Sequence, residues 1–150
     1  MDKIDKEILK ILQHDCSASL QQIADALHLT TTPCWNRIKR LEEQGLIKQR
    51  VALLEAEKLG LELIAFVQIK TQQHSESWFE EFVLQVKSFS QVMEFYRMAG
   101  EYDYMLKVLV KDMRSYDQFY KTLVNNVSGL TDVNSNFAME QLKYTTELPI

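Results

Sequence analysis

Residues 31–40 carry the side chains best suited to contacting nucleic acid. On a helical wheel of about 3.6 residues per turn, Asn36, Lys39 and Arg40 project away from the apolar side of this segment. Asparagine can bond an adenine edge, arginine can bond a guanine edge, and lysine or arginine can neutralise phosphate oxygens. The residues expected to contact DNA are Thr31, Thr32, Pro33, Trp35, Asn36, Arg37, Lys39 and Arg40. The same pattern also fits an ordinary solvated helix face, and Arg37 could pair with a neighbouring acid instead of a phosphate.

A second polar cluster surrounds Gly100. Glu101 and Asp103 bring carboxylates to this point, and Tyr102 and Tyr104 bring phenols. A tight turn also leaves backbone N–H groups free, and the combination could hold the ammonium and carboxylate of a free amino acid. A simple polar hairpin turn is the alternative interpretation.

Two asparagines interrupt the otherwise apolar last strand. Asn134 and Asn136 need polar partners if that strand is buried, so they could line the same pocket as the Gly100 turn. An edge strand that faces water would explain them equally well.

The sequence offers little support for enzyme chemistry. His14, His28 and His74 are widely separated, and there is no Ser-His-Asp set or glycine-rich phosphate loop. Cys16 and Cys34 have no metal-ligand spacing with these histidines, and we expect both to be reduced thiols, Cys34 being a buried packing residue. We therefore predict no catalytic residue, no metal site and no cofactor.

The elements that position the first group of residues are three predicted helices. Asp2 can cap the first helix, and Ser19 with Gln22 forms a capping-box pattern for the second. The threonine run 30–32 offers hydroxyl caps for the third, which Gly45 ends. The link of about three residues between the second and third helices is typical of a helix-turn-helix unit.

Beyond this unit the apolar period changes. Residues 46–54 are predicted to be extended, with a hinge before residue 62. The predicted strands and helices are Leu63–Lys70, Ser77–Lys87, Val92–Met98, Tyr104–Val110, a helix capped by Asp112, and Val133–Tyr144. The order β-α-β-β-α-β predicts a four-stranded antiparallel sheet with both helices on one face, the ferredoxin-like arrangement of an α+β protein. The predicted domains are residues 1–50 and 62–150, joined by a linker strand and hinge at 51–61.

The stretch Leu29–Ile47 resembles the recognition-helix signature of the Lrp/AsnC family of transcription regulators. Asp2-Lys-Ile-Asp5 and Gly100-Glu-Tyr-Asp-Tyr104 match the same family's pattern, so the resemblance covers essentially the whole chain. It implies a winged helix-turn-helix domain and a ferredoxin-like domain that pairs with a second copy and binds an amino-acid effector at a subunit interface. One departure is the triple threonine, where the family more often has Ser-Pro-Thr or Ser-Pro-Ser before the shared proline, and this could alter base preference.

The resemblance also implies partners. They are a double-stranded DNA operator, a small amino acid and further copies of the chain, as a dimer or a higher assembly such as an octamer. In detail the sequence looks closest to a subgroup tied to cysteine catabolism and detoxification, so cysteine is the first candidate effector, followed by leucine or methionine. The alternative is a tetrapyrrole-acting enzyme of the sirohaem decarboxylase type, whose fold is similar.

The net charge of −4 does not exclude a DNA-binding protein once it is divided along the chain. Residues 31–50 hold five basic and two acidic side chains, whereas residues 51–150 hold nine basic and fourteen acidic ones. So small a basic stripe predicts that one copy binds DNA weakly and that pairing supplies the rest. No apolar run approaches the about 20 residues that span a bilayer, so we expect a cytoplasmic protein without a membrane partner.

Overall fold

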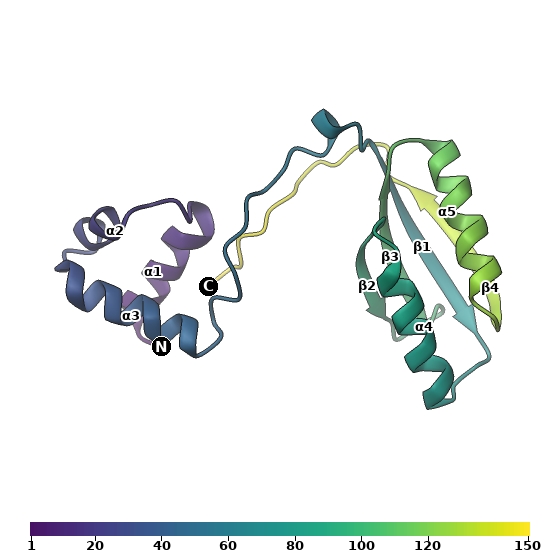
Figure 1. Cartoon of the computed structure of the whole chain (residues 1–150), viewed down its shortest axis with the longest axis horizontal. Helices are drawn as coiled ribbons and strands as arrows, with labels where there is room; N and C mark the ends of the chain where they lie inside the picture. Colours follow the sequence, from purple (N-terminus) through teal and green to yellow (C-terminus); the bar gives the residue numbers. More distant parts are fainter. The chain divides into compact units, whose positions relative to one another are not determined.

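The computed structural model describes residues 1–150, which form two compact units (Figure 1). The first contains Met1–Leu53 together with Leu142–Ile150, and the second contains Leu54–Gln141. The sequence assigned the C-terminal tail to the second domain, but the structure groups it with the first. The reason is a reciprocal pairing in which the Gln13 side-chain amide donates to the Leu148 carbonyl at 3.0 Å and accepts from the Leu148 N–H at 2.8 Å. No helix is long and apolar enough to cross a membrane.

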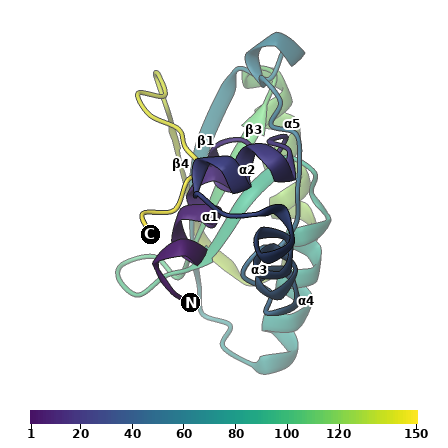
Figure 2. The ribbon, with the colours of Figure 1, turned by 90° about the vertical axis from the view of Figure 1, so that its left-hand side faces the viewer.

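Helices α1 (Lys3–His14) and α2 (Leu20–Ala26) begin at the predicted caps. Asp2 and Asp5 form a reciprocal capping box on α1, and Ser19 and Gln22 form one on α2. Each box satisfies two N–H groups that the first turn of a helix would otherwise leave unpaired. Figure 2 shows these helices together with α3.

Helix α3 (Thr31–Glu43) follows α2 after a short turn, as the helix-turn-helix spacing predicts. Thr30 is its N-cap residue but makes no side-chain capping bond, so the predicted hydroxyl cap is absent at that position. Within the turn His28 has a φ of +54°, in the left-handed region that favours glycine. Gly45 has a φ of +71° and follows the last turn of α3, as predicted.

No strand forms between α3 and the second unit. Residues 46–55 are irregular, and a single 3-10 turn, η1 (Glu57–Leu59), precedes Gly60. The extended segment predicted for residues 46–54 therefore makes no sheet pairing.

The second unit has the predicted β-α-β-β-α-β order (Figure 1). Its elements are β1 (Leu63–Thr71), α4 (Glu76–Ser88), β2 (Val92–Arg97), β3 (Tyr104–Val110), α5 (Met113–Asn126) and β4 (Leu130–Phe137). The strands form an antiparallel sheet in the order β2-β3-β1-β4, which confirms the ferredoxin-like arrangement. Side chains alternate along β1 and β3 between the buried face, against α4 and α5, and an open face.

The last strand was predicted too far along the chain. It begins at Leu130 and ends at Phe137, whereas the sequence favoured Val133–Tyr144. Its neighbour β1 starts at Leu63, and the final bond between them runs from the Ala138 N–H to the Ile64 carbonyl at 3.0 Å. Residues beyond 138 therefore have no strand left to pair with.

Candidate DNA-contacting helix and effector turn

The two faces of α3 divide as the helical wheel predicts. Cys34, Ile38 and Leu41 are at most 8% exposed and pack in the core of the first unit. Burial also raises the pKa of the Cys34 thiol, in keeping with a packing role. Asn36 lies on the opposite, exposed face and its side chain has no hydrogen-bond partner within the chain. The exposed face also contains Thr32, Pro33, Trp35, Lys39 and Arg40, while Thr31 and Arg37 are partly buried.

Trp35 stands on the flank of this face with half of its surface exposed. The Lys39 Nζ lies 5.1 Å from the centre of the Trp35 ring, a cation–π distance. The ring also borders a hollow of about 380 Å³ whose apolar wall includes Leu20, Ile23 and Ile38. Trp35 is therefore covered only in part by its own domain.

The two arginines of α3 are bound to two acids at the start of α1, the N-cap residue Asp2 and Asp5. Arg37 Nη1 donates to Asp2 Oδ2 at 2.6 Å and to Asp5 Oδ1 at 2.7 Å. Arg40 Nη2 donates to both carboxylate oxygens of Asp5, at 2.9 and 2.8 Å. Asp5 is only 1% exposed, while the Arg40 side chain is 49% exposed. Arg37 thus makes the acid pairing that the sequence left open, and Arg40 combines an internal ion pair with an exposed position.

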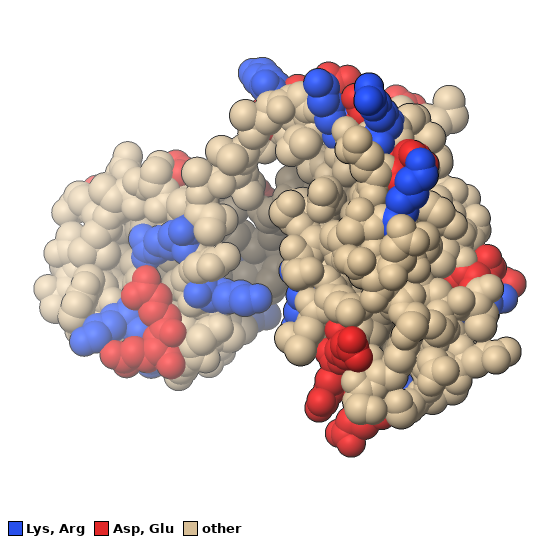
Figure 3. All heavy atoms as spheres, turned by 45° about the vertical axis from the view of Figure 1, so that its right-hand side comes forward, with Lys and Arg blue, Asp and Glu red and all other residues tan.

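Most other charges near α3 also have partners. Arg50 Nη2 lies 3.0 Å from Glu42 Oε1, and Lys39 Nζ lies 3.8 Å from Glu43 Oε1. In the face shown in Figure 3, basic and acidic side chains of the first unit lie next to each other rather than in a patch of one sign. The local excess of bases is therefore largely neutralised, which keeps the phosphate attraction of a single copy small.

Around Gly100, Asp103 fixes the β2–β3 connection to β1. Its Oδ2 accepts from the Thr71 N–H at 2.8 Å, its N–H donates to the Ile69 carbonyl at 2.9 Å, and its carbonyl accepts from the Met98 N–H at 2.8 Å. Gly100 itself has a φ of +153°, which favours glycine.

Tyr104 lies in the core instead of at an open surface. It is 5% exposed, and its ring centre is 4.8 Å from that of Phe82. Burial raises the pKa of its phenol, against a smaller opposing effect of Arg97. Tyr104 therefore supports the turn from the buried face of the sheet.

Glu101 and Tyr102 meet β1 and β4 on the other side. Lys70 Nζ lies 3.2 Å from Glu101 Oε1 and 4.7 Å from the centre of the Tyr102 ring. The hydrogen bond to Glu101 raises the pKa of Lys70. The Tyr102 hydroxyl donates to Asp132 Oδ2 at 3.3 Å. These four side chains place two carboxylates and one ammonium within a small area.

Asn134 and Asn136 continue this polar strip along the edge strand β4. Both amides lie within reach of Gln68 Oε1, at 3.4 and 3.5 Å, and both side chains are exposed. The strip, defined here as Glu101, Tyr102, Lys70, Asp132, Asn134, Gln68 and Asn136, runs along the open face. It contains four of the predicted effector-site residues, Glu101, Tyr102, Asn134 and Asn136, and three that the sequence analysis missed, Lys70, Gln68 and Asp132. The other three predicted residues, Gly100, Asp103 and Tyr104, are not part of the strip.

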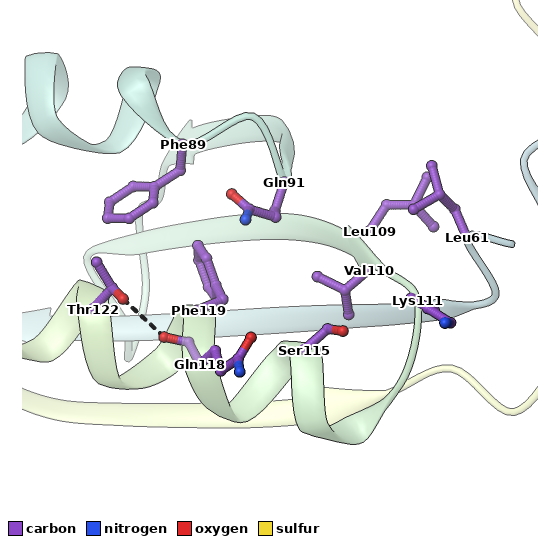
Figure 4. A pocket seen from close by; sticks show the side chains of 10 residues that line it. All are labelled: Leu61, Phe89, Gln91, Leu109, Val110, Lys111, Ser115, Gln118, Phe119 and Thr122. Atoms are coloured by element: carbon purple, nitrogen blue, oxygen red, sulfur yellow. Dashed lines mark hydrogen bonds between the residues drawn. The ribbon is translucent and has the colours of Figure 1, made fainter. Parts of the chain in front are cut away.

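A separate hollow of about 410 Å³ opens at the other end of β3 (Figure 4). Phe89, Leu109 and Phe119 form apolar parts of its wall, and Gln118 and Lys111 are among its polar lining residues. None of the predicted effector residues lines it.

Some of the missed residues left a signal in the sequence. Gln68 and Lys70 alternate with the apolar Val67 and Ile69, so a strand pattern would place them on the face away from the core. Asp5 left no comparable signal, because its partners on α3 are 32 and 35 residues away.

The fold and these sites define a DNA-binding protein with a separate ligand-binding domain. A winged helix-turn-helix DNA-binding family model matches residues 1–48, and the Lrp/AsnC ligand binding domain matches residues 64–148. The chain belongs to the Lrp/AsnC family, and it is a transcriptional regulator rather than an enzyme, as are its named relatives.

Among those relatives, the DNA-binding transcriptional activator DecR of Escherichia coli (strain K12) is 59% identical over 150 residues, which cover 100% of this chain and 99% of that protein. The crystal structure of an AsnC family transcriptional regulator from Agrobacterium tumefaciens is 48% identical, with a TM-score of 0.97 and coverage of 99% and 97%. The L-Met complex of the regulator NMB0573 from Neisseria meningitidis is 30% identical, with a TM-score of 0.93 and coverage of 99% and 96%.

Proposed function

We propose that this regulator binds a specific operator through α3 and that a small amino acid, bound at the interface of the C-terminal domains, changes its affinity for that operator. The proposed operator binding is supported by the exposed face of α3. On this face the Asn36 amide makes no hydrogen bond within the chain, and the Arg40 side chain is half exposed. An unpaired amide and a guanidinium one helical turn apart match the groups that read adenine and guanine edges. A protein that acts on operator DNA in this way would work in the cytoplasm.

Selection of duplexes from a random DNA library tests this proposal directly. We expect the wild-type protein to enrich one motif with two related half-sites, because paired subunits present two recognition helices to successive major grooves. Enrichment of no motif would contradict the proposed operator binding.

The proposed pairing surface is the open face of the sheet. Ile64, Phe66 and Met105 lie there, on the two central strands, and no helix of the unit covers them. Apolar side chains in the middle of an uncovered sheet are stabilised when a second copy removes them from water. This arrangement would give a dimer, from which a higher assembly such as an octamer can be built.

A charge at the centre of that face should prevent pairing. We expect Phe66→Lys, which sets a second cation opposite Lys107, to sediment as a monomer, whereas Leu84→Lys, on an exposed position of α4, should leave the assembly unchanged. A Phe66→Lys protein that sediments like the wild type would place the interface elsewhere.

Cysteine is the first candidate effector, and leucine or methionine the second. The strip offers Glu101 and Asp132 to an ammonium group and Lys70 to a carboxylate, which are the charged groups of a free amino acid. Binding would exchange the internal pair of Lys70 and Glu101 for pairs with the ligand. The Neisseria meningitidis regulator was solved as a complex with L-Met, which supports a ligand of this chemical class.

Asp103 provides the sharpest test of this effector site. We expect Asp103→Ala to lose amino-acid binding in calorimetry while DNA binding survives, because the carboxylate no longer holds the turn against Thr71. Asp103→Asn keeps an oxygen that can accept from the Thr71 N–H, so it should retain binding if the residue acts through the turn. Gln118→Ala, in the separate hollow, is the matched control and should bind normally. Normal binding by Asp103→Ala would require the site to be moved.

A further inference from the structure

The carboxylate of Asp5 is fully engaged beneath the recognition helix. It accepts from the Asp2 N–H at 3.0 Å, from Arg37 Nη1 at 2.7 Å, and from Arg40 Nη2 at 2.9 and 2.8 Å. An ionised carboxylate has about four acceptor positions, so Asp5 has none left for water or DNA. With 1% of its surface exposed, it cannot touch DNA itself.

Burial alone would raise the pKa of Asp5, but the Asp2 backbone bond and Arg37 outweigh it and hold the pKa below its usual value. Asp5 is therefore a fixed negative charge at neutral pH. A charge at that depth is stabilised only while its cationic partners remain in place.

Arg40 uses only one end of its guanidinium for this contact. Nη2 contacts Asp5, while Nη1 and Nε have no partner within the chain. A guanidinium has a rigid planar fork, so holding one nitrogen with two bonds fixes the direction of the others. Asn36 is four residues earlier on the same helix, so the two side chains start from neighbouring positions on the helix surface.

Arg37 is held differently. Its Nη1 is shared by Asp2 and Asp5, and its side chain is only 25% exposed. It ties the first turn of α1 to α3 and so supports the Asp5 carboxylate.

We propose that Asp5 is a positioning residue for DNA recognition. It aligns the free edge of Arg40 beside Asn36 so that these two side chains read adjacent bases. Arg37 stabilises this arrangement and does not contact DNA. Prior alignment lowers the conformational entropy lost when Arg40 binds a base. The inference rests on the operator binding proposed above and adds a specificity-determining residue that lies outside the DNA interface.

The buried charge has a second consequence. It partly neutralises Arg40, so removal of the charge should strengthen the attraction to any phosphate backbone while it weakens sequence reading. A residue with only a structural role would lower both kinds of binding together.

The test compares Asp5→Asn with wild type on the duplex that the wild type selects and on a scrambled duplex, by fluorescence anisotropy over a range of salt concentrations. We expect the ratio of specific to non-specific affinity to fall by about tenfold or more, the scale on which one base contact discriminates. Non-specific binding should be unchanged or tighter, with a steeper salt dependence. Asp2→Asn is the control: Asp2 bonds Arg37 but not Arg40, so its specificity ratio should stay near that of wild type.

Arg40→Lys provides a second route if Asp5→Asn folds poorly by circular dichroism. It keeps the positive charge but lacks the fork, so its specificity ratio should fall while its salt dependence is unchanged. The double variant should lose no more specificity than either single variant. The inference would be overturned if the ratio of specific to non-specific affinity were unchanged in Asp5→Asn or in Arg40→Lys. It would also be overturned if the specific and non-specific affinities fell equally, or if the losses of specificity in the two single variants added up in the double variant. Failure of the wild type to select any motif would instead refute the proposed operator binding.

Discussion

Replacement of Asn36 by alanine isolates base recognition from folding. The Asn36 side chain is exposed and makes no hydrogen bond within the protein. The free energy of unfolding should therefore change by no more than about 0.5 kcal/mol, the usual range for an exposed site without special contacts.

The effect on operator binding should be much larger. A bidentate contact between an asparagine and an adenine is worth about 1–3 kcal/mol of discrimination. If the proposed pair places two recognition helices on one operator, Asn36→Ala should cost about 2–6 kcal/mol, or roughly 30-fold to 10⁴-fold in Kd.

Fluorescence anisotropy with the selected duplex measures this change, and sedimentation checks that the oligomer is intact. Gln44→Ala removes an amide from the exposed C-terminal end of the same helix and should bind like the wild type. A Kd for Asn36→Ala within twofold of wild type would refute the assignment of α3 as the helix that reads bases.

Two further predictions concern the first unit. His28→Gly should raise the free energy of unfolding by about 0.5–1 kcal/mol, because relief of the strain at a left-handed φ exceeds the conformational entropy that glycine loses on folding. His28→Ala keeps a side chain at the same φ and is the control. A melting temperature for His28→Gly no higher than that of His28→Ala would disprove the prediction. The hydrogen bond that protonated His14 donates to the Glu147 carboxylate raises the pKa of His14 above 6.5. Their pairing should therefore hold the C-terminal tail fully below pH 6.5 and weaken as the pH rises through the raised pKa. NMR titration of His14 and the protection factor of the Leu148 amide measure both effects, and Glu147→Gln should remove them; an identical His14 titration in that variant would rule out the pairing.

Local patterns were enough to predict most elements of this fold. The reciprocal capping boxes at Asp2 and Ser19 mark helix starts through contacts three residues apart, and both are present. The spacing of apolar residues along α3 correctly predicted which face of the helix packs in the core, because burial on a helix follows the 3.6-residue period.

Features that depend on a distant partner were not predictable in this way. A helical wheel gives the direction of Arg40 but not the presence of Asp5 on another helix. The end of β4 depends on where β1 begins, and the docking of Leu148 depends on Gln13 at the far end of the chain. The family resemblance implies a place for Tyr104 at the effector turn, and strand alternation explains why its ring packs in the aromatic core.

Ion pairs between residues far apart in the sequence also change how the basic charge of α3 is interpreted. The bases of α3 that seemed available to phosphate are partly neutralised by Asp2 and Asp5. We therefore expect one copy to bind DNA weakly and strong binding to need several copies on one operator.

The central proposal is that amino-acid binding in one domain changes DNA binding in the other. Its most direct test is the Kd of the wild-type protein for the selected duplex, measured with and without saturating cysteine and then with each of the other nineteen amino acids. We predict that cysteine, or failing that leucine or methionine, shifts this Kd by about 5-fold to 150-fold, the usual range of allosteric coupling. A Kd that none of the twenty amino acids changes would contradict the proposal.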